Sequence, residues 1–315
     1  MPRTPCHDLL RLLLKSTGLK FEYEFVAFLL ALFEALIVFF LSKLQILLAI
    51  IAEIRNIHIF EIFVKMVKII ALCLAVLAVS AAAEPLPEKS TRVVGGVNAA
   101  IGQVPFMVSL RTNQGHFCGG AIISNRWILT AATCVLNKYP NDILLVVGTN
   151  TLNAGGVGYK VAQIIVHNQF NQNTYHNNIA LLKTTSNIVY TNYVKPVGLA
   201  SYDTPIGAVS TLAGWGYLSN GGQIPNYLQI VDTYTISYEQ CRNALINVNQ
   251  IVPTQLCTYI APGKGACAGD SGSPLAAGGQ LVGIVSWGVP CATGVPDVYT
   301  RVYAYRDWIR YYTGF

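Results

Sequence analysis

One serine of this chain lies in a turn whose residue types could support acyl transfer. The stretch Gly269-Asp270-Ser271-Gly272 places glycines close to Ser271 on both sides. Glycine permits a sharp turn and leaves backbone N–H groups uncovered. Two such groups, here those of Gly269 and Ser271, can stabilise negative charge that develops on a substrate oxygen, which is the role of an oxyanion hole. The pattern predicts a nucleophilic serine, with an ordinary loop as the alternative.

Six further motifs accompany this turn, and their order favours the nucleophile. Together they resemble the chymotrypsin/trypsin-like serine endopeptidases over residues 93–315. The resemblance implies an all-β fold of two six-stranded antiparallel β-barrels with a cleft between them and a short C-terminal helix. The motifs are Val93-Val94-Gly95-Gly96, Cys118-Gly119-Gly120, Leu129-Thr130-Ala131-Ala132-Thr133-Cys134, Asn178-Ile179-Ala180-Leu181-Leu182, Gly214-Trp215-Gly216 and Ser286-Trp287-Gly288.

The residues that should activate Ser271 depart from the family pattern. The resemblance places a general-base histidine after Thr-Ala-Ala, where this chain has Thr133, and an aspartate where it has Asn178. A serine hydroxyl needs a neighbour whose pKa lies near the working pH, which imidazole provides and a threonine hydroxyl does not. We therefore expect Ser271 to be retained without a general base.

Another histidine could in principle replace the missing base. After residue 92 the chain has only His116, His167 and His176. The resemblance places His176, two residues before Asn178, on the loop that lines the cleft and turned away from the serine. The resemblance assigns His116 to an activation switch. A displaced histidine nevertheless remains the alternative that would make this chain an active, digestive-type endopeptidase.

Short apolar runs with turn residues between them must position these groups. They predict an all-β barrel or sandwich within a domain of residues 93–315, and the resemblance narrows this to two barrels. The stretch 303–312 has Ala304, Trp308 and Tyr311 or Tyr312 at helical spacing, which predicts a C-terminal helix packing on the second barrel. The apolar runs are 107–110, 120–123, 143–147, 161–166, 229–231 and 281–287.

An activation switch is the next feature that the resemblance implies. Residues 84–92 are rich in proline and polar groups, so we expect an accessible propeptide. A trypsin-like protease cutting after Arg92 would free the amine of Val93 to pair with Asp270. Ser109 and His116 are the alternative partners of that aspartate in the precursor.

The segment before residue 84 holds most of the apolar excess of this chain. Met66-Val67-Lys68, an apolar run and Ser80-Ala81-Ala82-Ala83 form a predicted signal peptide over residues 66–83. Residues 1–65 would then be a mispredicted or alternative extension. Alternatively the run 25–51, long enough to span a bilayer but broken by two charges, is a signal-anchor that tethers the precursor to a membrane.

Cysteine usage agrees with an oxidising compartment. Six cysteines follow residue 92, and six alone permit fifteen pairings. The chain has no Cys-x-x-Cys and no histidine pair at ligand spacing, so we expect neither metal nor cofactor. The resemblance selects the pairs Cys118–Cys134, Cys241–Cys257 and Cys267–Cys291.

The resemblance also implies a substrate-binding side. The segment Ser286-Trp287-Gly288 corresponds to the one that hydrogen-bonds an extended peptide as an added strand. Gly265 stands where trypsins have the pocket aspartate, whereas Asp297 occupies another pocket position, as in arthropod collagenolytic and chymotrypsin-like members. We expect an offset negative charge that accepts basic or apolar side chains. Alternatively Asp297 pairs with a nearby base or faces solvent.

Charge adds little to this interpretation. After residue 92 there are eleven Lys and Arg against seven Asp and Glu, and they form no run, so nucleic acid is not an expected partner. Two hypotheses remain. The first is a secreted, monomeric, catalytically silent homologue that binds a peptide, a protease or a protease inhibitor. The second is a working endopeptidase with a non-standard base.

Overall fold

The computed structural model describes Lys43, Lys65 and residues 67–68, 95–289 and 291–315. The predicted propeptide 84–92 and Val93 lie outside these residues, as do nearly all of 1–65 and 66–83. The chain divides into two units, Met1–Leu86 and Pro87–Phe315, and the second carries every element discussed below. Among the described residues, no helix is long and apolar enough to cross a bilayer.

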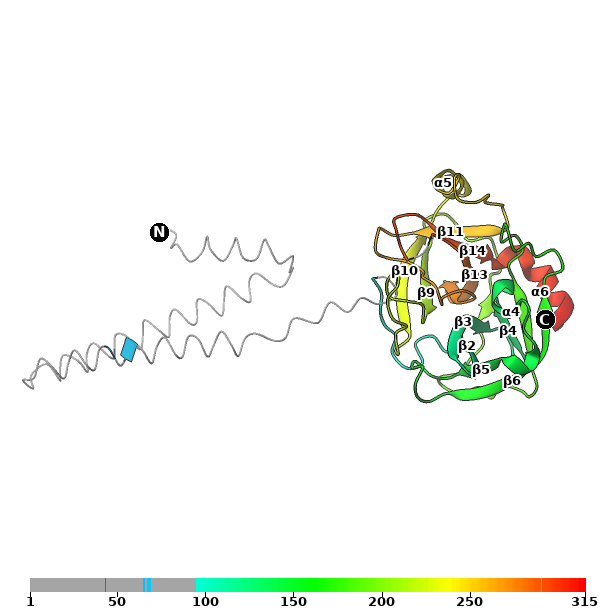
Figure 1. The fold of residues 1–315 in the computed structure, drawn as a ribbon, viewed down its shortest axis with the longest axis horizontal. Coiled ribbons are helices and arrows are strands. Elements are labelled where there is room, and N and C mark those ends of the chain that lie inside the picture. Colours follow the sequence, from blue (N-terminus) through cyan, green and yellow to red (C-terminus); the bar gives the residue numbers. More distant parts are fainter. Residues whose placement is uncertain (1–42, 44–64, 66, 69–94, 290) are drawn as a thin grey trace, which may run out of the picture. The chain divides into compact units, whose positions relative to one another are not determined.

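Six antiparallel strands of the first half close into a barrel (Figure 1). Aliphatic and β-branched residues that suit a pleated, half-buried surface make up most of them. In ring order they are β2 (Met107–Thr112), β3 (Gly115–Ile122), β4 (Trp127–Thr130), β7 (Ala180–Thr184), β6 (Val157–Val166) and β5 (Leu144–Val147). The short helices α4 (Ala132–Val135) and η1 (Pro140–Asp142) follow β4.

Six strands of the second half close in the same way, because β9 pairs with both β10 and β12. In ring order they are β9 (Val209–Gly214), β10 (Gln229–Thr235), β11 (Gln255–Tyr259), β14 (Asp297–Arg301), β13 (Gln280–Trp287) and β12 (Pro274–Ala277). Two short strands flank the ring, β1 (Val97–Asn98) on β10 and β8 (Gly198–Leu199) on β13. The two-barrel prediction is therefore confirmed.

Strand register determines which side chains meet in the cleft. Thr130 at the end of β4 lies opposite Ala180 at the start of β7. The residues just beyond this pair, Thr133 in α4 and Asn178 before β7, are therefore brought together. In the second barrel, Trp287 of β13 pairs with Val298 of β14, which places Asp297 beside the Ser286-Trp287-Gly288 segment.

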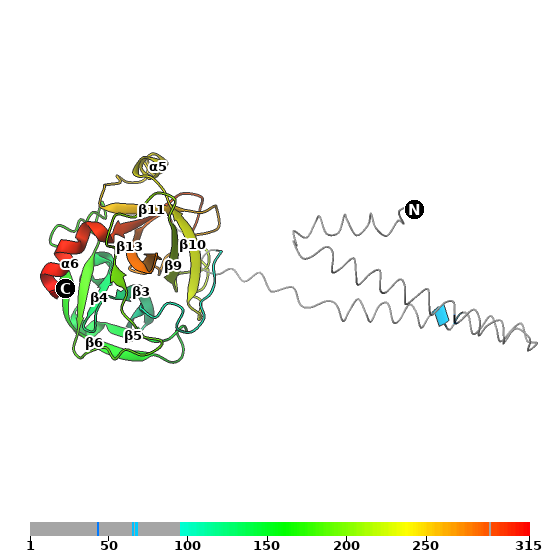
Figure 2. The ribbon, with the colours of Figure 1, turned by 180° about the vertical axis from the view of Figure 1, so that it is seen from behind.

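The predicted C-terminal helix is present, and its buried face contacts both barrels. It consists of η2 (Val302–Tyr305) and α6 (Arg306–Thr313), and its buried residues are Val302, Tyr305 and Ile309. They join a hydrophobic cluster that contains first-barrel residues together with Leu281 and Ile284 of β13, and η2 contacts β13. The helix α6 leads to the C-terminus at one side of the molecule (Figures 1 and 2). The predicted contact residue Ala304 is exposed, as is Tyr311. The predicted contact with the second barrel is therefore present, and it is made through the buried side chains of η2 and not through Ala304 or Tyr311.

All three disulfides implied by the resemblance are present. Cys118–Cys134 joins β3 to α4, close to Thr133. Cys241–Cys257 joins α5 (Tyr238–Ala244) to β11, and Cys267–Cys291 joins the loop before Ser271 to the loop before β14. The last two bridges brace the second barrel around the serine loop.

Candidate functional site

Ser271 lies in the loop between β11 and β12, held by close backbone packing. Gly269 and Gly272 have φ values of +93° and +79°, a region that residues with side chains rarely adopt. The N–H of Gly119 on β3 donates to the Ser271 carbonyl at 2.8 Å. Within the described chain, the N–H groups of Gly269 and Ser271 have no hydrogen-bond partner. Two donors therefore remain available beside the serine, as an oxyanion hole requires.

The carboxylate of Asp270 is fully buried behind this turn. It accepts hydrogen bonds from the N–H of Gly216 at 2.7 Å and of Cys267 at 3.0 Å. Burial raises its pKa to about 6, and the two N–H donors offset part of that rise. A Cβ at position 216 would overlap the Asp270 carboxylate, so only glycine fits there. The pairing of Asp270 with the Val93 amine stays a prediction, since Val93 and Arg92 lie outside the described residues.

The predicted Ser109 and His116 pair lies next to Asp270 but does not bind its carboxylate in this structure. His116 Nδ1 lies 2.9 Å from Ser109 Oγ, and His116 Nε2 lies 3.2 Å from the Gly269 carbonyl oxygen. Arg111 Nε donates to Ser109 Oγ at 3.0 Å. Burial lowers the pKa of His116 to about 4, so the ring is neutral and donates to the carbonyl through Nε2. The pair thus holds the Gly269 peptide group, whereas the Asp270 carboxylate accepts its hydrogen bonds from backbone N–H groups.

Thr133 and Asn178 form a hydrogen-bonded unit in place of an acid–base pair. The backbone N–H of Thr133 donates to Asn178 Oδ1 at 3.0 Å, and Asn178 Nδ2 donates to Ser286 Oγ at 2.9 Å. Nδ2 also lies 3.3 Å from the Ser286 carbonyl oxygen. Thr300 Oγ1 donates to the backbone carbonyl of Asn178 at 2.6 Å. Asn178 is therefore fully buried with its amide satisfied, and neither residue ionises near neutral pH.

The three histidines of residues 95–315 all lie in other hydrogen-bonded or packed positions. His116 contacts Ser109 and Gly269 as described above. His176 Nε2 lies 3.4 Å from the Gln250 carbonyl oxygen, and the ring of His167 packs against Tyr305 and Trp308. Within this part of the chain, Ser271 Oγ has no hydrogen bond to an imidazole. Ser271 therefore lacks a neighbouring base here.

A cavity of about 300 Å³ opens beside Ser271. Its wall joins both halves of the cleft, because it includes Thr133 from the first barrel and Asp297 from the second. Six predicted site residues therefore meet at this cavity, namely Thr133, Ser271, Ser286, Trp287, Gly288 and Asp297. The lining comprises Thr133, Tyr175, Ala266, Cys267, Ala268, Ser271, Val285, Ser286, Trp287, Gly288, Val289 and Asp297.

Asp297 supplies the negative charge of this cavity. It is 9% exposed and accepts one hydrogen bond, from the Ala266 N–H at 2.9 Å. Burial raises its pKa to about 7, the N–H lowers it, and the nearby Asp270 raises it further. Gly265 does not line the cavity, but a Cβ there would overlap the Asp297 carboxylate. The alternatives of a solvent-facing or base-paired Asp297 are therefore wrong, and Gly265 makes room for this side chain.

Tyr175 is a cavity residue that the sequence analysis missed. Its ring stacks on Trp287 with centroids 6.2 Å apart, and its φ is +56°, which is uncommon for a residue with a side chain. It therefore forms part of the cavity wall in contact with Trp287 of the segment expected to bind peptide. Its place on an irregular loop leaves no periodic signal by which the sequence could have indicated it.

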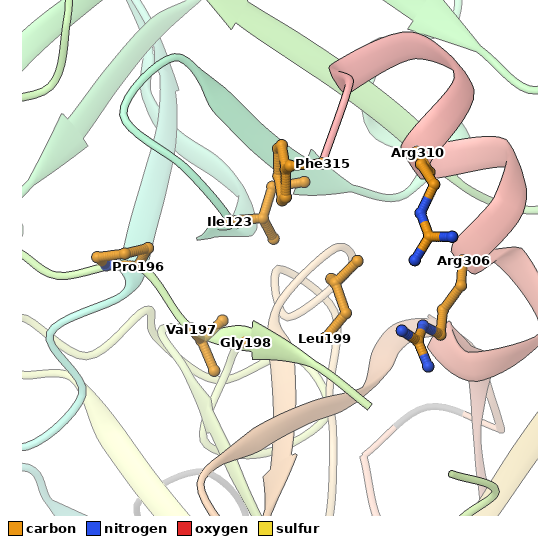
Figure 3. A pocket seen from close by; sticks show the side chains of 8 residues that line it. All are labelled: Ile123, Pro196, Val197, Gly198, Leu199, Arg306, Arg310 and Phe315. Atoms are coloured by element: carbon orange, nitrogen blue, oxygen red, sulfur yellow. The ribbon is translucent and has the colours of Figure 1, made fainter. Parts of the chain in front are cut away.

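A second cavity, of about 290 Å³, lies far from this chemistry at the junction of α6 with the first barrel (Figure 3). Arg306 and Arg310 of α6 line one side, and Leu199 and Ile123 line the opposite side. It holds no serine, cysteine, histidine or carboxylate side chain. The candidate catalytic site is therefore the cavity beside Ser271.

Comparisons with known proteins agree with this geometry. The family described as "Trypsin" matches residues 93–309. Chymotrypsin-2 of Vespa crabro is 40% identical over 219 residues, which cover 69% of this chain and 98% of that protein. Trypsin delta of Drosophila melanogaster is 39% identical over 227 residues, covering 71% of this chain and 89% of that protein. Trypsin alpha-4 of Lucilia cuprina is 37% identical, covering 71% and 88%. This chain therefore belongs to the trypsin family.

Proposed function

We propose that the chain is a catalytically silent serine protease homologue that binds a peptide or protein segment without cleaving it. One observation carries this proposal: Asn178 Oδ1 is bonded to the backbone N–H of Thr133, where the family has its histidine and aspartate. Where a triad loses its base alone, turnover falls roughly a millionfold. Neither a threonine hydroxyl nor a primary amide can take a proton from serine near neutral pH.

Peptide binding does not require a general base, and this chain has a cavity and a strand segment to which a peptide can bind. The cavity beside Ser271 contains Asp297 as a counter-charge for a basic side chain. The segment Ser286-Trp287-Gly288 borders it and offers backbone groups to an extended peptide. An exposed basic loop of a protease inhibitor or of another protease is a partner with this chemistry. We propose such a segment as the ligand.

We further propose that cleavage after Arg92 controls this binding and that the protein is secreted. Asp270 is a buried carboxyl group whose pKa is raised by burial. A neighbouring protonated amine would lower that pKa, because it stabilises the charged carboxylate. Asp270 sits directly behind the Ser271 turn and the cavity wall. A partner amine from Val93 would thus stabilise the binding surface, even though no reaction depends on it. Three disulfides support an oxidising compartment.

An active endopeptidase is the second candidate. The serine turn and its two free N–H donors are complete. The relatives that the chain matches carry the names chymotrypsin and trypsin. This candidate requires a base from outside residues 95–315, because the three histidines of that part bond elsewhere.

Calorimetric titration with an arginine-containing peptide amide, followed by mass spectrometry of the peptide, tests the proposal. The expected result is saturable binding by the chain cleaved after Arg92, with the peptide recovered intact after a day. Asp297→Asn should weaken binding, whereas Asp232→Asn, on the outer face of β10, should not. Hydrolysis of the peptide by a repurified preparation, lost in Ser271→Ala, would instead establish the active endopeptidase.

A further inference from the structure

Thr133 combines an unpartnered hydroxyl with a place beside the serine. Its Oγ1 is buried and has no hydrogen-bond partner in the described chain, although the residue lines the cavity together with Ser271 and Tyr175. A buried hydroxyl without a partner costs about 1–3 kcal/mol. A ligand that gives this hydroxyl a donor is therefore favoured at this wall of the cavity.

Rotation of one side-chain bond can present that hydroxyl to a ligand. The hydroxyl and methyl groups of threonine exchange places between staggered χ1 wells, and threonine populates two such wells in helices. Thr133 lies in α4, with its backbone N–H fixed on Asn178 Oδ1. The side chain can therefore turn without disturbing the backbone contact that anchors it.

A neutral imidazole has the two functions that this wall lacks. One ring nitrogen donates a hydrogen bond, which Thr133 Oγ1 can accept, and the other accepts one, which the Ser271 hydroxyl can donate. Its pKa near 6.5 makes it a base at neutral pH. No side chain of residues 95–315 supplies such a ring here, because His116, His167 and His176 are engaged elsewhere.

We propose that Ser271 is activated by a histidine of the bound ligand, so that the chain cleaves peptides that bring their own base. This proposal rests on the proposed function, since the protein itself supplies no base, and it restricts the catalytic silence to ligands that bring no imidazole to Ser271. The substrate class is a peptide with a basic side chain for the Asp297 cavity and a histidine next to it in sequence. Adjacent side chains of an extended peptide point to opposite sides, so the histidine turns away from Asp297 and faces the part of the cavity wall formed by Thr133 and Tyr175.

The chemistry balances with water as the only co-reactant. Ser271 Oγ bonds to the scissile carbonyl carbon while its proton passes to the imidazole, and the N–H groups of Gly269 and Ser271 face the oxygen that becomes negative. The C–N bond then breaks, and the imidazolium returns the proton to the leaving amine. Water hydrolyses the acyl-serine ester, which regenerates Ser271 and releases the carboxylic acid.

Free imidazole tests this activation without depending on peptide register. The chain cleaved after Arg92 is incubated with a fluorophosphonate probe, and labelling is read by mass spectrometry of the Ser271 peptide. Ser271 Oγ displaces fluoride from phosphorus, and the base takes the serine proton. With imidazole at roughly 0.1 M we expect labelling to accelerate about tenfold or more, since a free base recovers only part of the advantage of a positioned one.

Variants of Thr133 and a ring of the same size test whether imidazole acts as a base bound beside Thr133 or speeds labelling from bulk solution. Pyrazole has the same ring size but is a far weaker base, so it should give no acceleration. Thr133→Leu removes the hydroxyl and fills the wall, which should abolish the effect, whereas Thr133→Ala keeps room for the ring and should retain part of it. Ser271→Ala should show no labelling of this peptide under any condition.

Peptide substrates test the histidine directly. Arginine anilides that carry histidine or alanine immediately before the arginine should differ at least about tenfold in release of the aniline, in favour of histidine. Equal rates, or an unchanged labelling rate with imidazole, would overturn the proposal. Fast labelling of the unmodified chain without imidazole would instead overturn the proposed function, so the two failures are distinguishable.

Discussion

The two walls of the cleft differ in their ionisable groups. The wall from the second barrel carries Ser271 in a turn that glycines shape, and beneath it lie two buried carboxylates, Asp270 and Asp297. The wall from the first barrel carries Thr133 and Asn178, which are neutral and bonded to each other through backbone and amide. Among the cavity residues, the carboxylate lies on the nucleophile wall alone, whereas positive φ values occur on both walls, at Gly269 and Gly272 and also at Tyr175.

This difference teaches that the serine turn is held by packing that does not depend on catalysis. Gly119 supports the Ser271 carbonyl, and Gly216 and Cys267 support the Asp270 carboxylate. On the other wall, the Asn178 amide bonds the Thr133 N–H and Ser286 Oγ, whereas Thr133 Oγ1 has no partner in the described chain. The serine turn and the opposite wall are therefore held by separate sets of hydrogen bonds.

The largest expected effect comes from rebuilding the first wall. Thr133→His with Asn178→Asp should raise fluorophosphonate labelling of Ser271 by about a thousandfold or more, because it returns a base and the acid that orients it. Thr133→His alone should recover far less, since an asparagine at the aspartate position costs about 10⁴-fold in turnover. Equal labelling in the single and double variants would show that Asn178 is not the second defect.

Disturbing the second wall should cost stability. Gly216→Ala places a methyl group against the buried Asp270 carboxylate, which should lower the free energy of unfolding by about 3 kcal/mol in urea titrations. Gly198→Ala is the matched control, because a Cβ there meets nothing within 4 Å. Equal stability of both variants would contradict the tight fit of Asp270 in the turn.

Removing the amide that joins Thr133 to Ser286 should have a smaller cost. Asn178→Ala leaves the Thr133 N–H and Ser286 Oγ without their present partner. We therefore expect the free energy of unfolding, measured by urea titration, to fall by about 2 kcal/mol. Asn243→Ala, on the exposed surface of α5, should change stability by less than about 0.5 kcal/mol. Similar values for both would mean that the first wall is not held by this amide.

The smallest effect concerns the charge of the cavity. Burial raises the pKa of Asp297 to about 7, so the carboxyl is neutral below that pH and charged above it. Binding of n-butylguanidinium, measured by calorimetry, should therefore be about tenfold weaker at pH 6 than at pH 8. The neutral analogue n-butylurea and the variant Asp297→Asn should show no such dependence. A flat profile for the cation in the unmodified chain would place its binding elsewhere.

The sequence predicted the barrels, the disulfides and most cavity residues, because ordered motifs and alternating apolar runs carry that information. It did not indicate Tyr175, whose wall position depends on an irregular loop with positive φ values. It also placed Ser109 and His116 against Asp270, whereas the ring binds the Gly269 carbonyl. Which of two adjacent groups a side chain reaches depends on three-dimensional packing. The buried face of the C-terminal helix also differs from the expected one, since Ala304 and Tyr311 are exposed whereas Tyr305 and Ile309 are buried.

The most direct test is the rate at which a fluorophosphonate probe labels Ser271 in the unmodified chain, cleaved after Arg92 and free of added imidazole. We predict no labelling above that of Ser271→Ala within hours, because no described group of the first wall can accept the serine proton. Labelling at the rate of an active trypsin-family enzyme in the same assay would contradict it.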